Sequence, residues 1–158
     1  MIGASNIFGA QGTARIHRKL SDSLYVEAML LADEARAYFD EIGRDERDGL
    51  EAMSRVAFSC ESLKVTTRLM HIIAWLLTQR AVDSGELAAR DALSPSRRLG
   101  TAPDTDDAVL AAMPAQAATI MLTSIDLFRR VARLDASLDE PVQGSPARSM
   151  MDRLALAF

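Results

Sequence analysis

Few residues in this chain are of a type that supports catalysis or metal binding. The histidines are His17 and His71, and the lone cysteine is Cys60. A histidine ligand on a helix usually shares its metal with a carboxylate or histidine three or four residues away, and His71 has no such neighbour. We therefore interpret His71 as a half-exposed polar side chain. Cys60 lies within a helical pattern, which predicts a buried thiol, and a single cysteine fits a reducing compartment.

Motifs of the common enzyme classes are absent as well. The chain has no GxGxxG or Walker loop for phosphates, no CxxC pair and no GxSxG nucleophile elbow. Its carboxylate-rich stretches, residues 45–51 and 104–107, are most simply helix starts, because acidic side chains favour the positive end of the helix dipole. The sequence predicts a protein that is not an enzyme and has no metal or cofactor.

The composition indicates a single helical domain. The chain has 158 residues, of which 49% are hydrophobic and only 5% aromatic, and this balance favours helices over sheets. The formal net charge of −4 argues against nucleic-acid binding, which usually requires a basic face. The only candidates for such a face are Arg97, Arg98, Arg129, Arg130 and Arg133.

Neither a signal peptide nor a membrane span is predicted. Residues 1–20 lack the charged start and the continuous apolar core of a signal peptide. The longest apolar run, residues 69–77, falls far short of the ~20 residues that cross a bilayer. We expect a cytoplasmic protein without membrane contact.

The chain is predicted to be mainly helical, because apolar residues recur at three- and four-residue steps along it. The predicted main helices are residues 21–42, 45–83 and 114–138, with brief helical turns at 85–93 and 107–113. The link at residues 43–47 is short enough to join two antiparallel helices.

The predicted fold class is therefore all-α, with the helices forming an antiparallel three-helix bundle around a long central helix. Three glycines in residues 1–20, and two prolines with a glycine in residues 139–158, predict flexible ends on both sides of this bundle. The predicted division is a flexible N-terminal arm at 1–20, the bundle at 21–138 and a flexible tail at 139–158.

The central helix contains a segment, residues 69–79, without any Asp, Glu, Lys or Arg. It is apolar almost all the way round, whereas a surface helix needs an apolar stripe of only about 100°. Core packing covers part of it, and a ligand pocket around Trp75 is one interpretation of the rest. An uncovered apolar arc more often marks a protein–protein surface. The predicted face for self-association or cargo comprises Arg68, Met70, Ile73, Leu77 and Arg80.

The tail ends in an apolar segment, residues 150–158. One interpretation is a frayed end that packs loosely on the bundle. The other is a hydrophobic motif presented to a partner by a flexible tether, which raises its local concentration. The anchors of such a motif are Met150, Met151, Leu154, Leu156 and Phe158.

Several short motifs in the second helix together resemble a known family. They are Glu61-Ser62, Thr66 to Met70, Trp75 to Leu77, Gln79 to Ala81 and Gly85-Glu86. Pro114 and the segment from Arg133 to Asp135 match the same family in the third helix. The resemblance is to the regulators of CtrA degradation, the RcdA family of alphaproteobacteria. It covers roughly residues 21–138 and is strongest over 61–87.

The resemblance implies an adaptor rather than an enzyme. Members of this family are expected to form homodimers of three-helix bundles with a disordered C-terminal tail. They are expected to bring substrates such as CtrA to the ClpXP protease, with a CpdR-like response regulator and a PopA-like cyclic-di-GMP effector as further partners. The expected place of action is the cytoplasm, at the cell pole. Two other hypotheses stay open: a polar scaffold without a protease, and a nucleic-acid-binding regulator.

Overall fold

The structure is a computed structural model and describes residues 4–139 and 146–157. These parts of the chain are helical and contain no strand, which confirms the all-α class. The helices are α1 (Ala4–Ala37), α2 (Arg44–Asp48), α3 (Ala52–Asp83), α4 (Ala89–Ala92), α5 (Asp107–Ala111), α6 (Ala115–Ser137) and α7 (Pro146–Leu156). A π-helical turn at Tyr38–Ile42 extends α1, and a 3₁₀ turn at Pro95–Arg97 follows α4.

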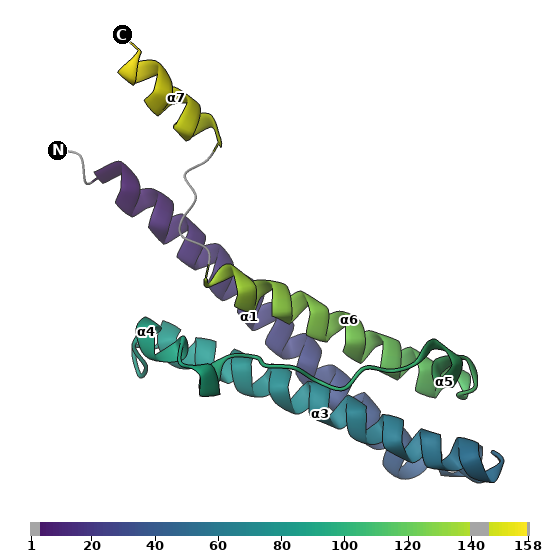
Figure 1. The fold of residues 1–158 in the computed structure, drawn as a ribbon. Coiled ribbons are helices and arrows are strands. Elements are labelled where there is room, and N and C mark those ends of the chain that lie inside the picture. The colour runs from purple at the N-terminus through teal and green to yellow at the C-terminus, as the bar shows by residue number, and fades with distance from the viewer. Residues whose placement is uncertain (1–3, 140–145, 158) are drawn as a thin grey trace.

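The long helices α1, α3 and α6 lie side by side and enclose one hydrophobic core (Figure 1). Each contributes an apolar stripe. In the first helix the expected members Leu24, Ala28, Leu31, Ala35 and Tyr38 are buried, whereas Ile42, expected on the same side, is 63% exposed. The largest fully buried apolar side chains are Trp75, Tyr38, Ile72, Leu76, Ile120, Met121 and Leu127.

The direction of α6 differs from the prediction. Helices α1 and α3 are antiparallel, as expected: Tyr25 lies against Arg80 at one end and Phe39 against Phe58 at the other. In contrast, α6 runs parallel to α3, because Arg68 contacts Ser124 and, further along both helices, Trp75 contacts Asp135. An antiparallel arrangement of all three helices is therefore wrong.

The reason lies in the crossover segment, residues 84–114, which returns along α3 before α6 begins (Figure 1). Arg98 in this segment contacts Asp135 near the end of α6, while the carbonyl groups of Pro103 and Asp104 accept hydrogen bonds from Arg68 and Lys64. Bundles with such a long connection depart from the simple up-and-down order.

Helix α1 is longer than predicted, because residues 4–20 are helical and not a loose arm. Gly9 and Gly12 each weaken a helix by roughly 0.5–1 kcal/mol relative to alanine, but helix-forming residues surround them. Contacts with α3 also continue into this segment: His17 Nε2 lies 3.2 Å from Gln79 Oε1, and Arg18 pairs with Asp83. Ser21, at the predicted start of this helix, lies within α1 and is buried.

Helix α3 begins at Ala52, later than the predicted start at Asp45, because the chain bends between α2 and α3. Its predicted end at Asp83 is confirmed, and Gly85 follows with a φ of +79° that suits glycine. The predicted short helices are confirmed by α4 and α5, and α6 follows directly after Pro114.

Gly43 lies so close to Tyr38 that a Cβ there would be 2.8 Å from both Tyr38 Cζ and the Tyr38 carbonyl oxygen. The Tyr38 ring cannot yield, because it is fully buried and its hydroxyl donates to Glu46. We expect Gly43→Ala to lower the free energy of unfolding by ~1–3 kcal/mol, as overpacking does. Gly49→Ala is the matched control in urea unfolding, because its nearest neighbour is Asp45 O at 3.5 Å. Equal effects of the two substitutions would contradict the prediction.

Candidate interaction surface

A row of exposed apolar residues follows the outward side of α3. Val56, Leu63, Met70 and Leu77 stand seven residues apart and are 58%, 67%, 65% and 47% exposed. Seven residues make nearly two turns of an α-helix, so all four lie on one side. Together with the exposed or half-buried residues between them, they form what we call the α3 face: Met53, Val56, Cys60, Leu63, Thr66, Thr67, Met70, Ala74 and Leu77.

The α3 face offers neither charge nor unused hydroxyl donors. Thr66 and Thr67 donate their hydroxyls to the carbonyls of Ser62 and Leu63 within the helix. The charged residues between positions 56 and 78 are Glu61, Lys64 and Arg68. None of them lies on the α3 face, and the Lys64 ammonium is held by Glu61 Oε1 at 2.8 Å. An uncharged seam with a seven-residue repeat is typical of helix–helix contact.

The predicted face is only partly the same surface. Met70 and Leu77 belong to the α3 face, whereas Ile73 is half-buried and packs against the core. Arg80 is exposed beside the face, with its guanidinium 3.9 Å from the centre of the Tyr25 ring and 3.5 Å from Asp22. Arg68 does not belong to the face, because it points to the opposite side and is 2% exposed.

The sequence reasoning missed Val56, Leu63 and the small residues between them. The seven-residue repeat that continues N-terminal to the charge-free segment could have identified Val56 and Leu63. Cys60 was predicted to be buried, but it is exposed on the α3 face. The prediction failed because a helical pattern places a residue on a helix without showing which side is covered. His71 is half-exposed, as predicted.

Arg68 belongs to a buried polar network that holds the crossover segment on α3. Its guanidinium donates to Ser124 Oγ, to Pro103 O and to Thr105 Oγ1, at 3.2, 2.9 and 2.7 Å. The Thr105 hydroxyl in turn donates to Glu61 Oε2 at 2.6 Å. Burial lowers the pKa of Arg68, an effect that the nearby Glu61 and Asp104 carboxylates oppose. Part of the family motif therefore serves internal packing.

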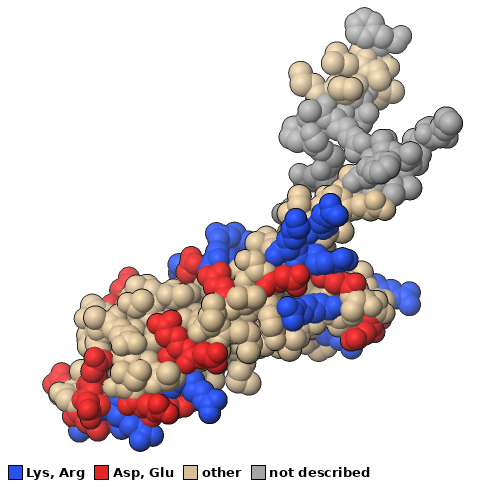
Figure 2. Space-filling model, turned by 180° about the vertical axis from the view of Figure 1, so that it is seen from behind, with Lys and Arg blue, Asp and Glu red and all other residues tan. Residues whose placement is uncertain are grey.

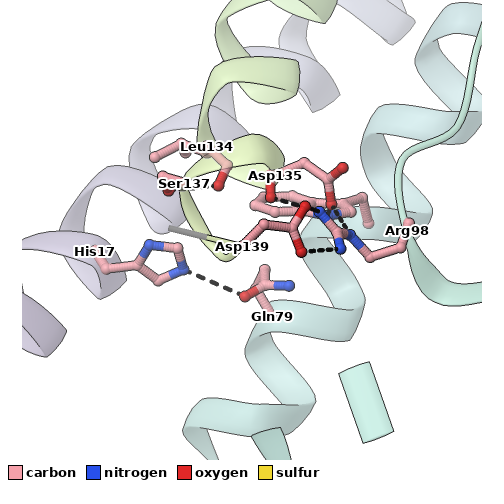
Figure 3. Close-up of polar contacts among 8 residues, drawn as sticks. His17, Gln79, Arg98, Leu134, Asp135, Ser137 and Asp139 are labelled. Carbon is pink, nitrogen blue, oxygen red and sulfur yellow. Dashed lines mark hydrogen bonds and ion pairs between the residues drawn. The ribbon is translucent and has the colours of Figure 1, made fainter. Parts of the chain in front are cut away.

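A second cluster fastens the crossover to the end of α6 (Figure 3). Arg98 Nε donates to Asp135 Oδ1 at 2.8 Å, and its Nη1 donates to Asp139 Oδ1 at 2.7 Å. The Trp75 indole N–H shares the same Asp135 oxygen at 2.8 Å. Hydrogen bonds from Arg98 hold the pKa of Asp139 below its ordinary value. Two matches to the family, Trp75 and Asp135, thus meet in one structural contact.

The five arginines proposed as a basic face do not form one free cationic surface. Arg98 is paired with Asp135 and Asp139, and Arg130 is paired with Glu27 and Asp126. Figure 2 shows that Lys and Arg side chains lie among Asp and Glu on the face it presents. Charge of both signs on one surface is a poor match for a phosphate backbone, which weakens the nucleic-acid hypothesis.

The predicted tail anchors lie on or beyond α7. Met150, Met151, Leu154 and Leu156 are 67%, 70%, 54% and 89% exposed, while Phe158 lies outside the described residues. The hydrophobic core contains none of these four residues. They remain available for a partner, which is the arrangement that a tethered motif requires.

Among the residues that the structure describes, no group of three or more His, Cys, Asp or Glu side chains could hold a metal ion. No helix within residues 4–139 and 146–157 is both long and apolar enough to cross a bilayer.

Comparison with known proteins supplies a family and a related structure. The family described as "Protein of unknown function (DUF1465)" matches residues 12–158. The crystal structure of RcdA from Caulobacter crescentus CB15 is similar, with 31% sequence identity and a TM-score of 0.62. This similarity covers 75% of the present chain and 90% of that chain. No curated protein sequence matches at a significant level.

Proposed function

The chain belongs to the DUF1465 family and is related to RcdA, and from this premise we propose that it is a non-enzymatic adaptor. The observation that carries the proposal is the α3 face, an uncharged helix surface with a seven-residue repeat that has no cover among the described residues. Such a face suits association with another helix. A regulator that works by binding needs a surface of this kind and no catalytic group.

The α3 face is proposed as the self-association surface. Two copies that pair along α3 bury the row of Val56, Leu63, Met70 and Leu77, and each copy offers small side chains opposite. Cys60, Thr67 and Ala74 recur at seven-residue intervals and allow the helix backbones to approach closely. The dimer would consist of two three-helix bundles in contact along these faces.

The finer function is proposed from the family resemblance. The dimer would deliver cargo such as CtrA to the ClpXP protease in the cytoplasm, at the cell pole. A CpdR-like response regulator and a PopA-like cyclic-di-GMP effector would be its further partners. In this proposal the helical core forms the dimer and binds cargo, while the exposed apolar side chains of α7 contact the protease machinery.

The role of the tail can be tested by deleting residues 140–158, which spares Asp139 and its contacts with Arg98. We expect degradation of CtrA by ClpXP, measured with purified components, to slow by at least about tenfold, since a tethered motif acts through effective concentration. A response regulator and effector are included in all reactions.

Two point variants in α7 test whether the apolar side chains themselves, and not the length of the tail, are needed for delivery. Leu154→Glu should reduce delivery as the deletion does, whereas Ala155→Glu, at a neighbouring exposed position outside the proposed anchors, should not. Delivery that is unchanged by the deletion would contradict the role of the tail. Pull-downs that recover partners but no ClpXP component would instead favour the polar scaffold.

A further inference from the structure

The α3 face complements itself when a second copy lies across it in the opposite direction. Along the face, large and small side chains alternate at steps of three and four residues. When two antiparallel α3 helices are centred on the level of Val65, residues at equal distances before and after Val65 lie opposite each other. This single register pairs members of the face with one another: Val56 with Ala74, Cys60 with Met70, Leu63 with Thr67, and Met53 with Leu77.

Each of the three central pairs joins a large side chain to a small one. The two helix backbones therefore keep the same separation along the middle of the contact, and each large side chain fills the space that a small one leaves. The outermost pair, Met53 with Leu77, joins two large side chains. Helices with a seven-residue contact repeat cross at roughly 20° and diverge from their crossing point, so larger side chains fit at the ends.

A parallel pair of α3 helices packs less well. A two-fold axis along the helices places each residue of the contact near its own counterpart. Leu63 would then lie against Leu63 of the second copy, and Thr67 against Thr67. The large pairs would hold the backbones apart and leave voids at the small pairs, and voids lower stability. Side-chain packing therefore favours the antiparallel direction.

Charges at the ends of the contact favour the same direction. Glu51 lies at the N-cap of α3 and Arg80 in its last turn, and both residues are exposed. The antiparallel register brings Glu51 of each copy to the level of Arg80 of the other, because they lie at nearly equal distances from Val65. A parallel pair would instead place two glutamates at one end and two arginines at the other. Exposed charges add little affinity, but they discriminate between orientations.

We propose that the α3 face binds a second copy of this chain in the antiparallel direction, with the two-fold axis at the level of Val65. The inference rests on the self-association proposed above and adds its direction and register. It also places the tails. Because α6 runs parallel to α3 and Asp135 accepts a hydrogen bond from Trp75, the end of each α6 lies roughly 15 Å from the axis along α3. The two tails therefore leave the dimer at opposite ends, where each can contact its own partner molecule.

Disulfide trapping on the full chain tests the direction and the register. Cys60 is the only cysteine of the parent chain and is exposed. Antiparallel pairing separates the two copies of Cys60 by roughly 15 Å along the helices, which is too far for a disulfide. Met70→Cys adds a thiol opposite Cys60 of the second copy. We expect this variant to form covalent dimers at least about tenfold faster than the parent in oxidised glutathione, measured by non-reducing electrophoresis.

Two further chains supply the controls. Met70→Cys combined with Cys60→Ala should lose the rapid cross-link, because position 70 faces position 60 and not itself. Leu122→Cys combined with Cys60→Ala carries its thiol on α6, at a position that is 50% exposed, and gives the rate of random collision.

The outcomes separate this inference from self-association itself. Rapid cross-linking of the parent chain would overturn the antiparallel direction, and cross-linking of Met70→Cys at the collision rate would overturn the register. Either result leaves self-association intact when the reduced parent sediments as a dimer. A reduced parent that sediments as a monomer at tens of micromolar would overturn self-association, and this inference with it.

Discussion

Met70→Glu is expected to raise the dissociation constant for self-association by about 100-fold. The side chain lies in the middle of the α3 face and is 65% exposed in the single chain. In a dimer along this face it would become buried against a second uncharged surface. Burying a carboxylate without a partner costs several kcal/mol, and about 2.8 kcal/mol corresponds to 100-fold in affinity. Sedimentation equilibrium over a range of protein concentrations measures the change.

The substitution leaves the fold of the single chain intact. Met70 is solvated and makes no hydrogen bond, and glutamate is a good helix former. Circular dichroism of the variant should therefore match that of the parent protein. A change in association then reflects the surface alone.

Two leucines of nearly equal exposure provide a matched control. Leu77 on the α3 face is 47% exposed and Leu122 on α6 is 50% exposed. Leu77→Glu should weaken self-association strongly, whereas Leu122→Glu should not. A parent protein that is monomeric at tens of micromolar contradicts the dimer. Equal weakening by both leucine variants contradicts the assignment to the α3 face.

The helices of this fold were predictable because each long helix buries one face. The three- and four-residue steps through Leu24, Ala28 and Leu31 place the core side of α1 correctly. The same pattern carries no information on helix direction. The parallel course of α6 and α3 depends on the crossover, whose contacts join Arg68 to Pro103 and Thr105, 35 and 37 residues away. Contacts at such separation leave no local periodicity.

The charge-free segment of α3 was predicted to need cover on more than one side, and the structure divides it. Ile72, Trp75 and Leu76 are core residues, whereas Met70 and Leu77 are exposed. Which residues become buried depends on how α3 is rotated about its own axis, and its contacts with α1 and α6 fix that rotation. The burial of Arg68 could not be predicted from the sequence, because arginines mostly lie on protein surfaces. Only its hydrogen-bond partners from the crossover segment and α6 make burial possible.

Arg68→Met is expected to lower the free energy of unfolding by ~3–5 kcal/mol, the range for breaking a buried charged network by removing one partner. Methionine fills much of the volume, so the loss is mainly electrostatic. The Glu61 carboxylate, 2% exposed, would remain buried with Lys64 and Thr105 as its hydrogen-bond partners. Urea unfolding at several protein concentrations separates this effect from any linked dissociation.

Glu61→Leu in the Arg68→Met background tests the cause. If the buried Glu61 carboxylate carries the loss once the nearby Arg68 charge is removed, the double variant should recover ~1–3 kcal/mol, because an apolar pair can replace a buried ionic one. Additive losses from the two substitutions would contradict the coupling through Thr105.

Arg68→Met should also speed hydrogen exchange of the amides at residues 99–106, since Arg68 binds Pro103 and Thr105.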